Sequence, residues 1–215
     1  MSSFSVMYPR LRIEAMGAPP ELMDLKIRDA ARIFMKEVPA YRALHADVII
    51  IPQTGDYLLP TLPADSELVR PLFINFLGTG ASRARPLFPL PESLARRDYR
   101  IIEGGLKYFT SPIFNTLTLI PVPDVNTTGS LQNIDLQLRP SRTSVTIDDD
   151  VLNRWEEEIM IGAQWLLYDM QDQPWTNKAE ARRYRLRFKQ EYADARRDLE
   201  LGFTKSNLRV VIPEL

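Results

Sequence analysis

The stretch that decides the fold lies in the last third of the chain. It reads Asp148-Asp-Asp-Val-Leu-Asn-Arg-Trp-Glu-Glu-Glu-Ile-Met-Ile-Gly-Ala163, then Asp172-Gln-Pro-Trp-Thr-Asn177, then Ala181-Arg-Arg-Tyr-Arg-Leu-Arg-Phe188. Apolar residues on each side of the middle segment recur every three or four positions, which is the period of an amphipathic α-helix. They are Leu152, Trp155, Ile159, Ala163, Leu166 and Met170, followed by Ala181, Tyr184, Phe188, Tyr192, Ala195 and Leu199. The pattern predicts two long helices within residues 148–202.

Local signals indicate where these helices begin and end. Asp148, with the two aspartates after it, puts negative charge at the positive end of the first helix dipole. Pro174, Trp175 and Asn177 mark the break, which we call the helix-break motif. Asn177 and Glu180 have the spacing of a capping box.

A third amphipathic helix is predicted near the N-terminus. Its apolar face contains Met23, Ile27, Ala30, Ala31, Phe34 and Val38. Pro20 suits a first helical turn, and Pro39 stops the helix. Residues 21–45 and 148–202 are therefore assigned to one helical domain, because three apolar faces must meet to be buried. Residues 1–20 are expected to be an extended or irregular N-terminal extension.

The middle of the chain has the pattern of β-strands. Leu117 and Leu119 alternate with polar residues, as do Ile134, Leu136 and Leu138. Pro71 interrupts the segment 68–77 and indicates an edge strand or a bulge. Residues 126–133 look like a polar loop. We predict an α+β fold: a discontinuous helical bundle with an inserted antiparallel β-domain at residues 46–147, followed by a C-terminal arm at residues 203–215.

Composition argues against an enzyme. The 215 residues carry a formal net charge of −1, no cysteine and a single histidine, His45. Cysteine chemistry is excluded, and a histidine-based metal site or triad has no second histidine. The aspartates at 148–150 lack the glycine and distal glutamate of an EF-hand. No run is apolar for long enough to span a membrane, and no signal peptide is expected. No catalytic, cofactor or metal site is predicted.

The last predicted helix is densely charged. Arg183, Arg187, Glu191, Asp194 and Arg197 lie at helical neighbour spacings that favour ion pairs, and a solvated or subunit-facing surface is the preferred interpretation. The basic run Arg182–Lys189 leaves DNA binding open as an alternative.

Several motifs, taken in order, resemble the head-to-tail adaptor proteins of podophages, the tail tubular protein A family of T7-like phages. The C-terminal motifs are Trp155-Glu-Glu-Glu-Ile-Met-Ile-Gly-Ala163, Pro174-Trp-Thr-Asn177 and Tyr184-Arg-Leu-Arg-Phe188. The upstream motifs are Arg28-Asp-Ala-Ala-Arg-Ile-Phe34, Gly55–Pro60, Leu117–Asp124 and Leu136–Ser141. The first 20 residues have no match in the family, and the connection 126–133 is longer than usual.

The resemblance implies a subunit of a twelvefold ring that lies in the virion at the head–tail junction. Such a ring binds the portal protein on one side and the tail nozzle on the other, helps to seat tail fibres, and lets DNA pass through its lumen without specific binding. Assembly is expected in the bacterial cytoplasm. The strand-like run of Leu208, Arg209, Val210, Val211 and Ile212 is expected to add to a neighbouring subunit or the portal. Alternatives are a neck or head-completion protein of another tail type, a DNA-binding protein and, least favoured, a metal-dependent hydrolase.

Overall fold

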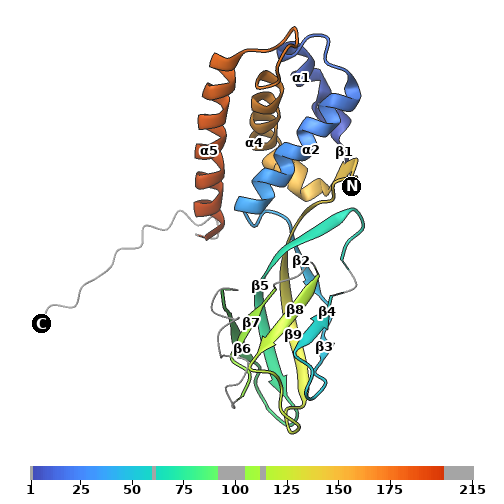
Figure 1. Ribbon diagram of the computed structural model, residues 1–215, viewed down its shortest axis with the longest axis vertical. Coiled ribbons are helices and arrows are strands. Elements are labelled where there is room, and N and C mark those ends of the chain that lie inside the picture. Colours follow the sequence, from blue (N-terminus) through green and yellow to red (C-terminus); the bar gives the residue numbers. More distant parts are fainter. Residues whose placement is uncertain (1, 60–61, 92–104, 112–114, 201–215) are drawn as a thin grey trace, which may run out of the picture.

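The computed structural model describes residues 2–59, 62–91, 105–111 and 115–200. It is an α+β protein, as predicted. A helical layer lies at one end of the molecule and a curled sheet at the other (Figure 1). The helices come from both ends of the chain and the sheet strands from its middle. The predicted C-terminal arm at residues 203–215 lies outside the described residues.

Three long helices form most of the helical layer: α2 (Pro20–Glu37), α4 (Asp149–Tyr168) and α5 (Lys178–Glu200). Proline begins α2, where a missing N–H costs nothing. Asp148 caps α4 by accepting a hydrogen bond from the Asp150 N–H at 3.0 Å. Within α4 the backbone bends at Trp155, whose φ and ψ are not helical.

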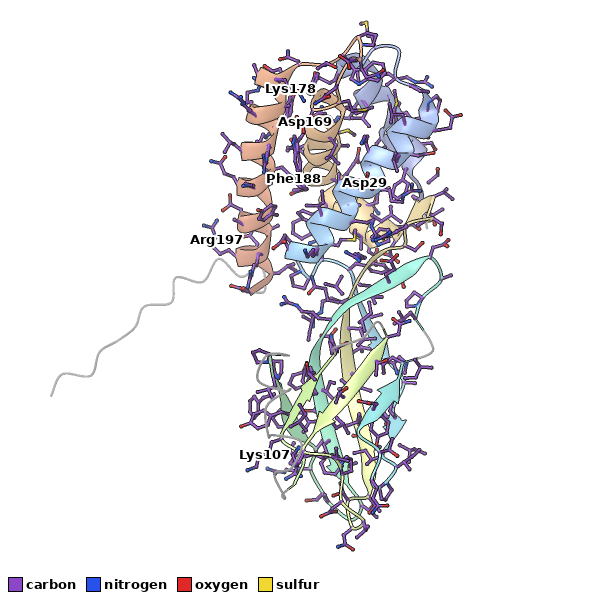
Figure 2. The ribbon with its side chains drawn as sticks, viewed as in Figure 1. Asp29, Lys107, Asp169, Lys178, Phe188 and Arg197 are labelled. Carbon is purple, nitrogen blue, oxygen red and sulfur yellow. The ribbon has the colours of Figure 1, made fainter. Side chains whose placement is uncertain are left out.

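The three helices meet at Gly162 of α4. A Cβ atom there would lie 2.8 Å from Cε2 of Phe188 on α5 and 2.9 Å from Cβ of Ala30 on α2. Phe188 points from α5 toward the other helices (Figure 2), and its ring lies 6.4 Å from that of Phe34. Only a residue without a side chain permits this close approach.

The N-terminal segment is not the extended or irregular extension expected from the sequence. The two-residue strand β1 (Ser2–Ser3) is followed by a 3₁₀ turn, η1 (Phe4–Met7), and by helix α1 (Tyr8–Glu14). Phe4, Met7 and Leu11 are fully buried. The prediction failed because α1 is too short to show a clear helical period, and its stability comes from packing against the rest of the layer.

The large sheet has the order β2-β9-β5-β6-β7-β8-β4, with β3 also paired to β9. Its strands are β2 (Arg42–His45), β3 (Val48–Ile49), β4 (Asp56–Leu58), β5 (Ser66–Gly78), β6 (Arg85–Pro89), β7 (Tyr108–Thr110), β8 (Thr116–Ile120) and β9 (Gly129–Pro140). The alternating leucines and isoleucines of β8 and β9 are buried, as their pattern indicated.

The sheet is mixed, which corrects the prediction of an antiparallel β-domain. Among the described strands all pairings are antiparallel except that of β6 with β7, which is parallel. Residues 90–107 separate these two strands in sequence, which is long enough for the crossover that parallel strands require. Register shifts flank Pro71 in β5, in agreement with the predicted irregularity.

Two short strands pair with elements outside the domain to which the sequence assigned them. Residues 42–45, assigned to the helical domain, form β2 and pair with β9. β10 (Thr146–Ile147), assigned to the β-domain, pairs instead with β1 beside the helices. The predicted polar loop ends early, because β9 begins at Gly129. These short strands depend on distant partners and leave little trace in the local sequence.

A polar network joins the helical layer to the sheet. Arg32 of α2 contacts Glu67 of β5 at 3.0 Å and donates to the Pro140 carbonyl at the end of β9. Arg139 of β9 contacts the same carboxylate at 3.2 Å. Burial by itself would raise the pKa of Glu67, but the hydrogen bond and charge of Arg32, with the charge of Arg139, lower it overall. The network therefore connects α2 to β5 and to the end of β9.

Candidate functional site

The helix-break motif forms a tight corner between α4 and α5. Trp175 is buried with 9% of its surface exposed. The Thr176 hydroxyl donates to the Met170 carbonyl at 2.9 Å, and the Asn177 N–H donates to the Tyr168 carbonyl at 3.1 Å. These bonds fix the corner at the end of α4 (Figure 1).

Asn177 then caps α5, as its spacing predicted. Its side-chain oxygen accepts a hydrogen bond from the Glu180 N–H at 3.2 Å. Two further contacts tie the corner to α4: Lys178 Nζ lies 2.9 Å from an Asp169 carboxylate oxygen and 2.5 Å from the Asp169 carbonyl. These contacts hold the first turn of α5 against the last turn of α4.

The predicted ion-pair helix forms its pairs within one chain. Arg187 lies 3.3 Å from Glu191 and 3.2 Å from Glu157 of α4. Asp194 lies 3.1 Å from Arg197, which is on the outer side of α5 (Figure 2). Exposed pairs of this kind contribute only about 0–1 kcal/mol each, so a neighbouring molecule could exchange partners with them at little cost.

Arg183 follows the same pattern and lies 2.7 Å from Glu180. All five residues predicted for the ion-pair surface thus have a partner in their own chain. Whether they also contact another copy stays a prediction.

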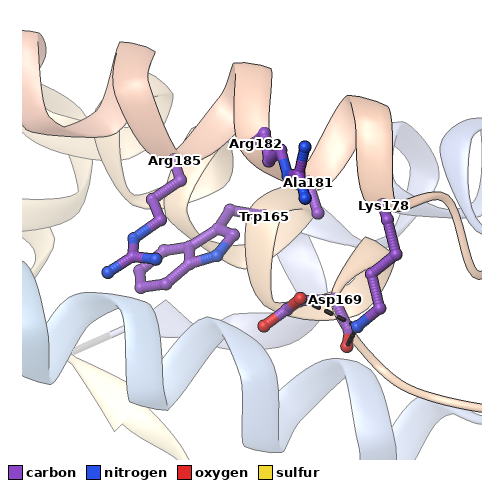
Figure 3. Close-up of a pocket in the computed structure, with 6 residues that line it drawn as sticks. All are labelled: Trp165, Asp169, Lys178, Ala181, Arg182 and Arg185. Atoms are coloured by element: carbon purple, nitrogen blue, oxygen red, sulfur yellow. Dashed lines mark hydrogen bonds and ion pairs between the residues drawn. The ribbon is translucent and has the colours of Figure 1, made fainter.

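A pocket of about 200 Å³ opens between α4 and α5 beside the corner (Figure 3). Its lining consists of Trp165, Asp169, Lys178, Ala181, Arg182 and Arg185. The Arg185 guanidinium carbon lies 5.6 Å from the centre of the Trp165 ring, which is a cation–π contact. Phe188 also packs against that ring, with 6.0 Å between ring centres.

The pocket has a net positive charge. Three cations line it, and the one lining carboxylate, Asp169, is already paired with Lys178. Within the described part of the chain Arg182 has no ion-pair partner. A partly buried aromatic ring beside two arginine side chains suits a carboxylate or phosphate group with an apolar neighbour.

Sequence reasoning assigned Trp165 to packing or an interface and did not find this pocket. Arg182 and Arg185 share a helix face, and this part of the pocket could have been found from their spacing. Trp165 is on the other helix, and the corner between α4 and α5 places it beside them. The basic run Arg182–Lys189 was identified as a whole. In the structure Arg183 and Arg187 form ion pairs, whereas Arg185 lies over the Trp165 ring.

The other sequence candidates form no site in the described residues. No cluster of three or more potential metal-binding side chains occurs in residues 2–59, 62–91, 105–111 and 115–200. His45 is at the end of β2, and its Nδ1 lies 2.8 Å from the Ala46 carbonyl oxygen. In the described part of the chain, no helix is both long and apolar enough to cross a membrane. The run Leu208–Ile212 lies outside this part.

No protein-family model matches the chain, and no curated protein matches it either.

Proposed function

We propose that this chain is a non-catalytic structural subunit of the ring that joins the head of a short-tailed phage to its tail. The observation that carries the proposal is the corner at Pro174–Asn177. The three C-terminal motifs that resemble the adaptor family lie together in the helical core: Gly162 of the first motif contacts Phe188 of the third, and the second motif forms the corner between them. These motifs therefore support one another as parts of a single structural unit.

The proposed ring contains twelve copies, binds portal protein on one face and the nozzle on the other, and seats tail fibres. DNA passes through its lumen. The outer surface of α5 is compatible with that passage, because most of its arginines are paired with carboxylates of the same chain. A surface balanced in this way does not hold phosphates tightly. Residues 208–212 are proposed to add a strand to a neighbouring subunit or to the portal.

The proposal is tested by mixing the purified chain with isolated portal rings of a short-tailed phage and measuring the mass of the product. We expect twelve copies per portal ring. A variant lacking residues 203–215 is expected to bind portal rings more weakly. Unchanged binding would refute the proposed role of these residues but not the adaptor function. A chain that never associates with portal rings would refute the adaptor function. A different copy number on another tail component would favour a neck or head-completion protein.

A second candidate function is DNA binding, because Arg182, Arg185 and Lys189 form an exposed stripe on one face of α5. Their spacing of three and four residues places them side by side. Retention on duplex DNA that falls steeply as salt rises would support this function. No retention at low salt would dismiss it.

A further inference from the structure

Two surfaces of complementary chemistry lie on opposite flanks of the helical layer. One is the pocket between α4 and α5, with Trp165, Arg182 and Arg185. The other, which we call the acidic flank, contains the start of α4 together with β1, β10 and η1. In Figure 1, α5 and β1 lie on opposite sides of the helical layer.

The acidic flank combines carboxylates with exposed apolar side chains. Asp149 and Asp150 are exposed in the first turn of α4, and the Ser2 hydroxyl of β1 donates to Asp149 at 2.5 Å. Val145, just before β10, is 56% exposed, and Val6 of η1 is 57% exposed. The Phe4 N–H donates to the Val145 carbonyl, which ties these segments together.

We infer that the acidic flank of one copy docks into the α4–α5 pocket of the next copy. The carboxylate of Asp150 would meet Arg182 and Arg185, and Val145 would lie against the exposed part of the Trp165 ring. This inference rests on the proposed ring and names the faces that meet in it. Since the two surfaces differ and lie on opposite flanks, the contact is head-to-tail, and such a contact generates a ring or an open filament rather than a closed pair.

The chemistry of the pocket favours a protein segment over duplex DNA. Trp and Arg are among the residues enriched at the positions that contribute most to binding between proteins. A pocket of about 200 Å³ admits one or two side chains and is too small for the backbone of a duplex.

The absence of cysteine allows a direct test by cross-linking. Ala179 and Asn153 are exposed and lie one helical turn from Arg182 and Asp150, so cysteines there leave the charges intact. Oxidising the Ala179→Cys/Asn153→Cys variant on portal rings should give a ladder of linked chains. The matched control Ala193→Cys/Asn153→Cys has its α5 cysteine about 21 Å further along the helix and should give at least tenfold less product.

Charge reversal provides a second test of the contact. Arg182→Glu and Asp150→Arg, each added to the cross-linking variant, should reduce the ladder at least tenfold, and the two together should restore it. Both side chains are exposed, so thermal unfolding followed by circular dichroism should show folded proteins throughout.

Each failure has its own meaning. Rings of the expected mass with no 179–153 cross-link would overturn this contact and leave the proposed function standing. A product that stops at two chains would show a symmetric contact and overturn the head-to-tail arrangement. An unlimited ladder with no closed ring would support the contact and refute the ring. Duplex DNA that blocks the cross-link and is released by Arg182→Glu would assign the pocket to DNA instead.

Discussion

The substitution Gly162→Ala tests whether the contact of three helices determines the helical layer. In an exposed helix this change would stabilise the protein by about 1 kcal/mol, because alanine is the better helix former. At this position the new Cβ lies 2.8 Å from Phe188 Cε2 and 2.9 Å from Ala30 Cβ. Normal carbon contacts are about 3.5–4.0 Å, so one or more helices must move.

The change in the free energy of unfolding depends on which neighbouring groups can move away from the new Cβ atom. Phe188 is 1% exposed and is packed against Phe34, Trp165 and Tyr192, so its ring has no free direction. Ala30 Cβ is attached directly to the backbone of α2, so that contact is relieved only by shifting the helix. Overpacking of this kind costs about 1–3 kcal/mol. After the gain in helix propensity, we expect a net loss of about 0–2 kcal/mol.

Urea unfolding measures the loss. With an m-value of about 2 kcal/mol/M, a loss of 2 kcal/mol lowers the midpoint by about 1 M. Ala193→Gly, at an exposed position on α5, calibrates the propensity term and should cost about 1 kcal/mol. Ala30→Gly combined with Gly162→Ala should show a favourable coupling of about 1 kcal/mol or more. A Gly162→Ala protein more stable than the wild type by the full propensity gain would refute the close contact.

Three further predictions concern the joint and the corner. Glu67→Gln should reduce stability by roughly 1.5–3 kcal/mol, because charge-assisted hydrogen bonds from Arg32 and Arg139 are lost; unchanged urea midpoints would contradict this. The folded protein holds the pKa of Glu67 below its ordinary value. The stabilisation by the ionised Glu67 side chain is therefore present above about pH 4.3 and is lost as pH falls toward the lower folded pKa. The acid-induced loss of stability should accordingly be smaller in Glu67→Gln than in the wild type. Asn177→Ala should cost about 1 kcal/mol through loss of the cap, whereas Asn177→Asp should be nearly neutral; equal unfolding temperatures for the two variants would exclude a capping role.

The sequence by itself determined the features that depend on neighbouring residues. The apolar periods gave α2, α4 and α5 nearly complete, and Asn177 gave the cap of α5, because helical hydrogen bonds and caps connect residues three or four positions apart. The α+β class followed from the change of period in the middle of the chain. The interpretation of the chain as an adaptor came from the order of its motifs and stays a proposal.

Only the tertiary structure decided how these elements meet. The buried N-terminal helix α1, the pairing of β2 with β9 and the parallel pair β6–β7 depend on partners far away in the sequence, for which the local pattern carries no information. The same holds for the Arg32–Glu67–Arg139 network and for the pocket at Trp165. Their physical cause is the packing of side chains from different elements, because burial and charge pairing act across space and not along the chain.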